Sequence, residues 1–433
     1  MLDINYIRAN QSKVEDAIRN KGYGDEIDLG EILKLDDERK RLAAEADKLR
    51  HDRNEISAKM KNGKPDAALI EQGKELKKQL AEIEPKLTEV EASFISKLKT
   101  VPNVPEDDVP VGLSEDDNEV AEVCGEPTKF DFEPRTHWEL AQQRGWLDKE
   151  RAAKVTGARF AYIKGDMVKL QMAIVNFVMN SLTDENVIKD IIKKNKLKDV
   201  STKPFTLVLP PLMLRTEMYD AMDRLEPRED RYKIEGQELW LQGSAEHVLG
   251  SMHQGEIFEE KELPIRYLGY ATSFREEAGT YGKDMEGIIR MHQFDKLEME
   301  SFTTKETSRS EHEFFVAIQR WLVEQLELPY RVIRKCTYDI GKPDARGIDI
   351  EVWMPGQDKY RETHTADYMT DYQSRRLGTR VRRAEGEVEL VHTNDATAFA
   401  LGRAMVAVIE NNQNEDFTVT IPTVLRKYRC QQR

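Results

Sequence analysis

The chain of 433 residues carries a formal net charge of −14, with 34% charged and 39% hydrophobic residues. At roughly 100–200 residues per domain, this length predicts two or three domains with buried cores. The chain has no apolar run of roughly 18 residues, which excludes a membrane span, and its acidity argues against coating nucleic acid through bulk charge.

Residues 1–30 form a short mixed segment without the apolar stretch of a secretory signal, so we expect no such signal. The three cysteines, Cys124, Cys336 and Cys430, lie far apart and form no CxxC pair. This spacing argues against a disulfide scaffold or a zinc site. A reducing cytoplasm fits this use of cysteine best.

Residues 31–99 are predicted to form a long helical hairpin. Leu35, Leu42, Leu49 and Ile56 recur every seven residues, which is the spacing of a coiled-coil seam. Turn residues at 62–66 interrupt the pattern. A second seam follows at Leu69, Leu76, Leu80, Ile83, Leu87, Val90 and Phe94. Two such helices form an antiparallel arm on the order of 45 Å long, with a local kink expected at Pro85.

The hairpin is nearly neutral, unlike the rest of the chain. Residues 31–100 contain 16 Lys and Arg and 15 Asp and Glu, so the negative charge lies elsewhere. The hairpin is therefore the one long segment that a polyanion would not repel. The alternative is a solvated coiled coil used for dimerisation or spacing, because charged flanks are usual in such helices.

After the hairpin, residues 101–110 are proline-rich and acidic and predict a linker. Strands are then predicted at 205–209, 348–354 and 418–421, a pair of antiparallel strands at 267–274 and 289–300, and a helix at 396–411. Because these strands follow one another without βαβ alternation, we expect an α+β fold. It would have a mixed, mostly antiparallel sheet flanked by helices.

The strand pair at 267–300 carries the densest group of candidate functional residues. Even spacing places Arg275 and Glu277 on one face, together with Arg290, Phe294 and Glu298 from the facing strand. Guanidinium groups suit phosphate oxygens, a ring suits stacking on a base, and a carboxylate accepts from an amino or ammonium group. This combination predicts a nucleotide site. The alternative is a set of cross-strand ion pairs on a solvent-facing sheet.

Other candidates lie further along the chain. Glu351 and Glu362 lie in and just after the strand at 348–354, where they are candidate Mg²⁺ ligands or, alternatively, surface carboxylates. Arg403 lies within an apolar helix, where a charge needs a partner or a cavity, and Gly402 would allow a close approach. The absence of GxxxxGK[ST] excludes a P-loop, and there is no GxSxG or HExxH to support nucleophilic hydrolysis or a zinc protease.

Together these features resemble the seryl-tRNA synthetases, a family of class II aminoacyl-tRNA synthetases. The resemblance covers nearly the whole chain and is strongest at residues 137–166, 273–300, 348–362, 400–416 and 420–428. It implies an N-terminal tRNA-binding domain at 1–100, a linker at 101–135 and a class II catalytic domain at 136–433. It also implies a homodimer, whose class-specific dimer motif would be the region up to Pro210.

The resemblance implies ATP and Mg²⁺ as cofactors. Arg275 would bind the α-phosphate and, with Arg403, would be catalytic. Glu277 would bind the adenine amino group, and Phe294 would stack on the ring. Arg290 and Arg403 would hold the γ-phosphate, and Glu362 and Thr365 would support Mg²⁺. The implied ATP site comprises Arg275, Glu276, Glu277, Arg290, Met291, Phe294, Glu362, Thr363, His364, Thr365 and Arg403.

For the amino acid, the resemblance implies that Glu298 binds the serine ammonium and that Thr397 lies close to the substrate hydroxyl. The implied serine site comprises Ser244, Ala245, Glu246, Arg275, Glu298 and Thr397. Departures from the family pattern fall here and at the Mg²⁺ position. Ser244 stands for the usual threonine, residues 362–368 read Glu-Thr-His-Thr-Ala-Asp-Tyr, and residues 394–398 lack the usual glycines. A charged stretch at about 186–203 is expected to be an insertion.

The implied function is ATP-dependent ligation of L-serine to tRNA(Ser), and to tRNA(Sec) where present, through a seryl-adenylate. No DNA and no membrane are expected as partners. The hairpin would follow the long variable arm of tRNA(Ser) through its basic side chains. These are Lys34, Arg39, Lys40, Arg41, Arg50, Arg53, Lys74, Lys77 and Lys78.

Two alternatives stay open. One is a paralogue that activates another small amino acid for a carrier protein; the complete hairpin argues against it, whereas the altered pocket residues argue for it. The other is a catalytically inactive RNA-binding homologue. The second alternative would be expected to lose the charged set, whereas Arg275, Glu277, Arg290 and Arg403 are all present.

Overall fold

The computed structural model describes residues 1–24, 26–61, 67–278 and 286–428. The chain divides into two compact units, Met1–Val104 and Pro105–Arg433. Within the described residues, no helix combines the length and the apolar character that a membrane crossing requires.

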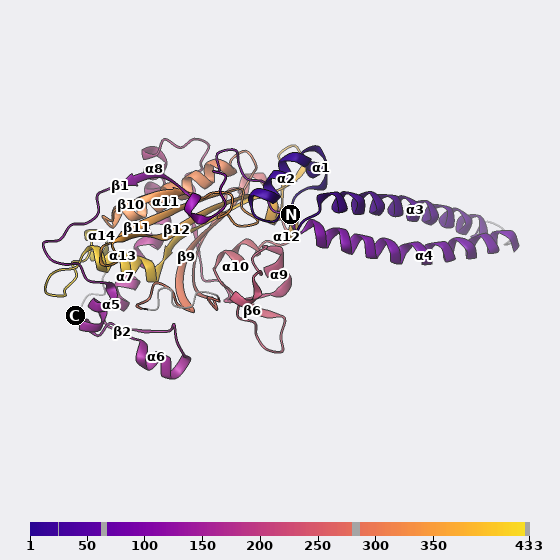
Figure 1. Ribbon diagram of the computed structural model, residues 1–433. Helices are drawn as coiled ribbons and strands as arrows, with labels where there is room; N and C mark the ends of the chain where they lie inside the picture. The colour runs from indigo at the N-terminus through magenta and orange to yellow at the C-terminus, as the bar shows by residue number, and fades with distance from the viewer. Residues whose placement is uncertain (25, 62–66, 279–285, 429–433) are drawn as a thin grey trace. The chain divides into compact units, whose positions relative to one another are not determined.

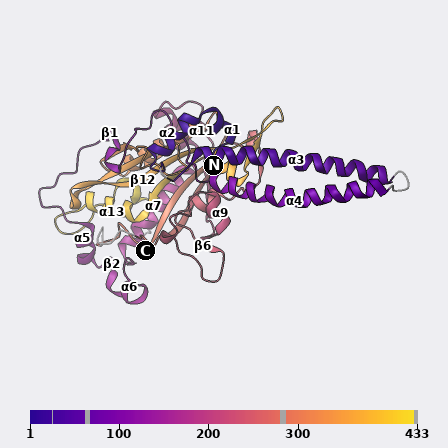
Figure 2. The same cartoon turned by 45° about the vertical axis from the view of Figure 1, so that its right-hand side comes forward.

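The first unit is helical. Its elements are α1 (Ile4–Ala9), α2 (Gln11–Asn20), α3 (Leu29–Lys61) and α4 (Ala67–Leu98). The helices α3 and α4 lie side by side along their length (Figure 1), and Figure 2 shows the same pairing from another side. Ion pairs join Glu31 to Lys97 at 2.8 Å and Arg50 to Glu84 at 3.0 Å, so the two helices run antiparallel. The predicted hairpin is confirmed, while its predicted turn at 62–66 lies outside the described residues.

Asp36 ties the hairpin to the first helix of this unit. Its fully buried carboxylate pairs with Arg39 and Lys40, each at 2.8 Å, and with Arg8 of α1 at 2.7 Å. Burial alone would raise the pKa of Asp36, but these three cations lower it to about 2. Arg39 and Lys40, both predicted to contact tRNA, are therefore already engaged in ion pairs within the unit.

Other basic residues of the hairpin that were predicted to contact tRNA are also paired. Arg41, Arg50 and Lys74 form ion pairs with the hairpin's own glutamates. These side chains are exposed, and exposed ion pairs contribute little to stability. Phosphate groups can therefore replace the glutamates at small cost.

The second unit is built on one eight-stranded sheet. In spatial order its strands are β1 (Glu119–Cys124), β10 (Tyr330–Arg334), β11 (Arg346–Met354), β12 (Lys359–Thr370), β15 (His392–Ala400), β9 (Gln293–Thr303), β8 (Ile265–Phe274) and β4 (Thr206–Val208). Neighbouring strands are antiparallel except β4, which runs parallel to β8. The expected mixed, mostly antiparallel sheet with helices is confirmed.

The two faces of this sheet differ in chemistry because side chains alternate along each strand. On β9, Leu297 and Met299 join the main hydrophobic core, whereas Lys296, Glu298 and Glu300 point to the other face. The core face packs against long helices. They are α7 (Asp166–Leu182), α8 (Glu185–Lys194), α11 (Ser308–Gln325) and α13 (Leu401–Asn411). The opposite face of the central strands is thus left for polar groups.

Shorter elements surround the sheet. The helices are α5 (His137–Arg144), α6 (Lys149–Thr156), α9 (Thr216–Ala221), α10 (Glu246–Gly250), α12 (Tyr372–Leu377) and α14 (Thr423–Arg426), with 3₁₀ turns at Glu115–Asp117, Arg228–Asp230, Glu260–Glu262 and Pro355–Gln357. Small sheets pair β14 (Val388–Leu390) with β13 (Arg380–Arg382) and β7 (Ile257–Glu259), β2 (Leu147–Asp148) with β3 (Tyr162–Ile163), and β5 (Met213–Arg215) with β6 (Leu239–Leu241).

Some sequence predictions need correction. The helix predicted at 396–411 begins only at Leu401, because residues 396–400 pair with β9 and β12 as strand β15. The strand predicted at 418–421 is reduced to one isolated bridge between Gln413 and Val419. Residues 101–135, expected to be a linker, contribute β1 to the sheet. The stretch at 186–203 forms most of α8, whose Ile188 and Ile191 join the core, and its being an insertion stays a prediction.

Candidate active site

Most of the predicted site residues line one cavity of about 440 Å³ on the polar face of the sheet. The predicted residues in its wall are Arg275, Glu277, Arg290, Met291, Phe294, Glu362, Thr363, Thr365, Thr397 and Arg403. They come from segments far apart in the sequence, which the strand order β12-β15-β9-β8 brings together. The wall also includes Asp230 and Lys296, which the sequence analysis did not select.

Arg275 and Phe294 form the centre of the cavity wall. Phe294 lies near the start of β9, opposite Ser273, and Arg275 directly follows the end of β8. The Arg275 guanidinium carbon lies 5.4 Å from the centroid of the Phe294 ring, and its Nε donates to the Gly243 carbonyl at 3.0 Å. His292 holds the backbone of Arg275, because the Arg275 N–H donates to the His292 carbonyl at 3.0 Å.

Glu277 and Arg290 face each other across the same region. Arg290 Nη1 lies 2.5 Å from Glu277 Oε2, so the pairing expected from the alternative, ion-pair interpretation does occur. However, these two residues lie beyond the strand ends and line the cavity, whereas that interpretation placed them on a solvent-facing sheet. Glu277 adopts a left-handed backbone conformation with φ of +52°, which costs energy in a residue with a Cβ. Such strain is typical of functional segments.

Arg403 and Glu362 form the second ion pair of the cavity. Arg403 lies in the first turn of α13, and its Nη1 lies 3.1 Å from Glu362 Oε1 and donates to the Glu362 carbonyl at 2.8 Å. Burial would raise the pKa of Glu362, but the Arg403 guanidinium outweighs it and lowers the pKa below its ordinary value. The Glu362 carboxylate and the Thr365 hydroxyl offer the hard oxygen ligands that Mg²⁺ prefers.

Two residues predicted to bind ATP lie outside the cavity wall. His364 lies outside the wall that its neighbours Thr363 and Thr365 line: its ring packs on Phe399 with centroids 4.8 Å apart, and its Nδ1 lies 2.8 Å from the Thr363 hydroxyl. Burial lowers the pKa of His364 to about 3, so the ring is neutral. Glu276 also misses the wall, although its N–H donates to the carbonyl of Asp230, which lines it.

Glu351, the other candidate metal ligand, is engaged elsewhere. It faces Glu362 across β11 and β12 but pairs with Arg331 of β10. The alternative interpretation, a structural surface carboxylate, is therefore correct for Glu351.

The predicted serine residues lie deeper than the nucleotide residues. Ser244 precedes α10, and its hydroxyl donates to Glu298 Oε2 at 3.2 Å and accepts from Lys296 Nζ at 3.1 Å. Lys296 also forms an ion pair with Glu298. Because Lys296 and Thr397 line the cavity, they connect this buried polar group to the open space. Ala245 has no polar role and packs with Leu249.

The two carboxyl groups at this end have opposite pKa shifts. Burial raises the pKa of Glu298 to about 7, with Lys296 opposing and Glu246 adding to the rise. Burial would raise the pKa of Glu246 too, but Arg224 holds it well below its ordinary value. The site thus combines one ionised carboxylate with one that titrates near neutrality.

His137 supports the opposite wall. Its Nδ1 lies 2.8 Å from Glu410 Oε1 on α13, and its Nε2 accepts from the backbone N–H of Ile288 at 3.3 Å. Gly287, with φ of +67°, must lack a side chain, because a Cβ there would lie 1.7 Å from His137 Nε2. Ile288 and the three residues after it line the cavity, so His137 fixes the segment that carries Arg290.

Sequence reasoning missed Lys296, Asp230, Arg224 and His137. Lys296 carried a usable signal, since it lies two residues before Glu298 on the same strand face. The other three are brought to the site by folding alone, and no local pattern marked them.

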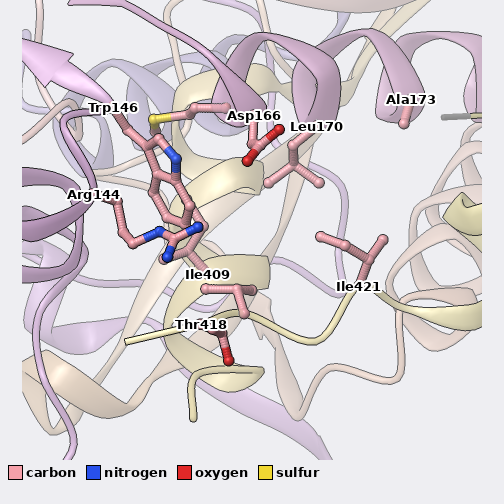
Figure 3. A pocket seen from close by; sticks show the side chains of 10 residues that line it. Arg144, Trp146, Asp166, Leu170, Ala173, Ile409, Thr418 and Ile421 are labelled. Carbon is pink, nitrogen blue, oxygen red and sulfur yellow. The ribbon is translucent and has the colours of Figure 1, made fainter. Parts of the chain in front are cut away.

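A second, smaller cavity of about 110 Å³ contains none of the predicted residues. Figure 3 shows Arg144 and Trp146 close together, with Ile409 next to them and Ile421 farther across the cavity. The Arg144 guanidinium lies 5.6 Å from the Trp146 ring centroid, so the two side chains form a cation–π contact.

Two family models match the chain. Residues 230–412 match the "tRNA synthetase class II core domain (G, H, P, S and T)", and residues 1–105 match the "Seryl-tRNA synthetase N-terminal domain". Among curated relatives, the serine--tRNA ligases of Thermodesulfovibrio yellowstonii and Methanocella arvoryzae are each 38% identical to the chain. Each alignment covers 99% of this chain and 98% of the relative.

Solved structures agree with these matches. The seryl-tRNA synthetase from Pyrococcus horikoshii, solved in complex with ATP, superposes with a TM-score of 0.87 at 36% identity, over 99% of this chain and 98% of that chain. The cytoplasmic serine-tRNA ligase from Naegleria fowleri, solved with AMP, has a TM-score of 0.82 at 25% identity, over 99% and 97%. Sequence, domain order and fold lead to the same conclusion: this chain belongs to the seryl-tRNA synthetase family of the class II aminoacyl-tRNA synthetases.

Proposed function

We propose that the cavity binds ATP and L-serine side by side and that its residues activate serine for transfer to tRNA. The chain is an ATP-dependent serine--tRNA ligase that acts through a seryl-adenylate. The observation that carries the assignment of the site is the convergence of Arg275, Phe294 and Arg403 on one cavity next to buried carboxylates.

At the nucleotide end, Phe294 stacks on the adenine and Glu277 accepts from its amino group. Arg275, held over the ring, reaches the α-phosphate. Arg290 and Arg403 bind the γ-phosphate after exchanging their present partners, Glu277 and Glu362, for phosphate oxygens. Replacing these ion-pair partners costs little free energy, because the pairs line an open cavity.

Glu362 and Thr365 are the proposed Mg²⁺ ligands. They supply one carboxylate and one hydroxyl oxygen, and substrate phosphate completes the set. The ion would neutralise phosphate charge. The pairing of Arg403 with Glu362 keeps the carboxylate ionised and ready for a cation.

At the amino-acid end, Glu298 and Glu246 receive the serine ammonium, and Ser244 orients Glu298. Thr397, in the cavity wall opposite Glu298 on β15, hydrogen-bonds the side-chain hydroxyl. A site that uses a hydroxyl hydrogen bond rejects analogues without the hydroxyl strongly, so alanine is excluded, whereas threonine must be excluded by size.

Serine activation is an in-line displacement. The serine carboxylate oxygen attacks the α-phosphorus of ATP, the bond to the bridging oxygen breaks, and pyrophosphate leaves. Arg275 and Arg403 stabilise the charge that develops on the phosphate oxygens, so the protein contributes positioning and electrostatics without a nucleophile of its own. The terminal hydroxyl of tRNA then attacks the adenylate.

The hairpin of α3 and α4 is the proposed reader of tRNA(Ser), and of tRNA(Sec) where it occurs. Lys34, Arg53, Lys77 and Lys78, together with the paired basic residues of the hairpin, would follow the phosphates of a helical stem by its shape. Because the partners are RNA and ATP, we assign the chain to the cytoplasm, where the free thiols Cys124 and Cys336 stay reduced.

A homodimer is the proposed assembly. β4 is an edge strand of the large sheet, and Leu207, Leu209, Leu212 and Met213 in and after it are exposed apolar side chains. Natural proteins avoid leaving such an edge uncovered. A second copy of the chain is the simplest cover.

The test combines two assays on purified protein. ATP–pyrophosphate exchange, measured with each of the twenty amino acids, should respond to serine only. Deletion of residues 35–95 should leave serine-dependent exchange nearly intact and abolish tRNA charging. Exchange with glycine or alanine but not serine would favour a carrier-loading paralogue. No exchange at all would favour an inactive homologue, and loss of both activities in the deletion would refute a separable RNA-binding arm.

A further inference from the structure

Buried carboxylates crowd behind the amino-acid end of the cavity. Glu246, Glu298, Glu300 and Asp395 have exposed fractions of 9% or less. Carboxylate oxygens of Glu246, Glu298 and Asp395 lie within 4.8 Å of one another. Like charges at this distance in a dry environment repel strongly, so the cluster requires protons or a cation to form at all.

Arg224 lies beside two carboxyl groups of this cluster, those of Glu246 and Asp395. Its Nε lies 3.0 Å from Glu246 Oε1, and its Nη2 lies 3.0 Å from Asp344 Oδ1 and 3.8 Å from Asp395 Oδ2. Within the described residues, both oxygens of Asp395 have no hydrogen-bond partner, so the nearby guanidinium is their electrostatic support. Arg224 thus connects α10, the segment before β11 and strand β15.

The position of the Arg224 side chain is fixed by its surroundings. A Cβ on Gly341 would lie 2.8 Å from Arg224 Nη1 and 2.5 Å from Asp344 Oδ2, so the glycine makes room for this ion pair. The carbonyl of Arg224 accepts from Arg231 Nε at 3.2 Å. The guanidinium therefore acts as a fixed charge.

We propose that Arg224 is a positioning residue for amino-acid binding: its guanidinium holds the Glu246 carboxylate in place, so that Glu246 and Glu298 together receive one ammonium group. The inference rests on the proposed assignment of this end of the cavity to the amino acid. It adds a residue that does not touch the substrate but determines whether the carboxylate pair can bind it.

The direction of the pKa shifts agrees with this role. Burial raises the pKa of Asp395 and of Glu300, and neighbouring carboxylates add to both rises, with Arg224 opposing. Glu246 alone is held below its ordinary pKa, with Arg224 as the largest opposing cause to burial. Loss of Arg224 would raise the pKa of Glu246, and the ammonium group would lose part of the negative charge that binds it.

Arg224→Gln tests the proposal, with Arg224→Lys as the milder change. In the exchange assay, R224Q should raise KM for serine at least tenfold and leave KM for ATP within twofold. R224K should raise KM for serine less, because it keeps the charge but loses the fork geometry. The double variant R224Q/D395N should recover part of the loss, because it also removes the buried carboxyl group that Arg224 no longer supports.

Arg266→Gln is the matched control. Arg266 is also fully buried and paired with a glutamate, Glu311, but it lies outside the cavity wall. R266Q should lower the melting temperature without changing either KM. If R224Q does not fold, Asp344→Asn carries the same test, because it frees one anchor of the guanidinium and should raise KM for serine alone.

Three outcomes would overturn the proposal. They are equal changes in both KM values, a loss of stability without a change in KM for serine, and no recovery in R224Q/D395N. If the proposed function itself were wrong, the unmodified protein would show no serine-dependent exchange. That result is distinct from the outcomes above.

Discussion

The two ends of the cavity hold their charges in different ways. At the nucleotide end, Arg290 and Arg403 are partly exposed, lie beyond strand ends, and pair with the carboxylates of Glu277 and Glu362. At the amino-acid end, Glu298 lies in the middle of a strand with no exposed surface. The first arrangement lets ion pairs exchange partners, whereas the second fixes charges before the substrate arrives.

The difference reflects what each end has to bind. A triphosphate brings several negative charges. Arginines that are paired with glutamates can bind these charges at little cost in free energy, because partly exposed ion pairs are weak. A single ammonium group must be bound by charges that water does not screen, and burying them requires a network that includes Lys296, Ser244 and Arg224. Substitutions at the two ends should therefore affect different kinetic constants.

Arg275 borders both ends, and its loss should have the largest effect. Its Nε donates to the carbonyl before Ser244, and its guanidinium lies over Phe294. R275Q should lower kcat for exchange by about 10²–10³-fold, the usual loss for a group that stabilises transition-state charge. R334Q, which breaks an ion pair with Glu119 of the edge strand β1, is the control. A loss below tenfold in R275Q would show that another group carries this charge.

Phe294→Ala should affect the nucleotide end only. Stacking on a base contributes about 1–3 kcal/mol, so KM for ATP should rise roughly 5- to 150-fold while KM for serine stays unchanged. The measurement is exchange at varied ATP with saturating serine, and F294Y serves as the conservative control. A parallel rise in both KM values would indicate that the two ends are not independent.

Substitutions of His137 test the nucleotide wall through a smaller expected change in KM for ATP, because each substitution removes a different hydrogen bond. Asn can replace only the Nδ1 group that contacts Glu410, whereas Gln can replace only the Nε2 acceptor that receives the Ile288 N–H. Loss of one such hydrogen bond costs about 0.5–1.5 kcal/mol, so H137N should raise KM for ATP roughly two- to tenfold and H137Q should not. H312Q, at another fully buried histidine, controls for general loss of packing. The reverse order of H137N and H137Q would exclude this role.

The smallest expected effect is a pH dependence that belongs to the amino-acid end. The pKa of Glu298 rises from 4.5 to about 7 in the folded protein. The folded state therefore keeps a proton that the unfolded state releases, and this group's contribution to stability falls as pH rises from 4.5 to 7. Relative to E298Q, the unmodified protein should lose free energy of unfolding over that window, as measured by urea denaturation.

Serine binding should show the opposite trend in the unmodified protein. An ionised Glu298 is needed for the ammonium, so KM for serine should fall as pH rises through about 7, with KM for ATP unaffected. Denaturation curves of the unmodified protein and E298Q that keep a constant separation from pH 5 to 8 would show that Glu298 does not titrate in this range.

The nucleotide end was the more predictable one from sequence. Phe294 lies at the start of β9, and Arg275 and Arg290 lie just beyond the paired ends of β8 and β9, so local spacing was enough to bring the three together. The amino-acid end depends on contacts such as that of Arg224 with Asp395, which only the completed sheet creates. The helix predicted at 396–400 failed for the same reason: pairing with two neighbouring strands outweighed the apolar composition.

Gly402 shows how little room the nucleotide wall leaves for variation. A methyl group on its α-carbon would lie 3.0 Å from the Ile288 carbonyl oxygen, tighter than ordinary van der Waals contact. The start of α13 therefore packs so closely against the segment that carries Arg290 that no additional carbon atom fits between them. Natural variants should therefore keep glycine at position 402. Substitutions intended to widen the ATP pocket should be made at other positions.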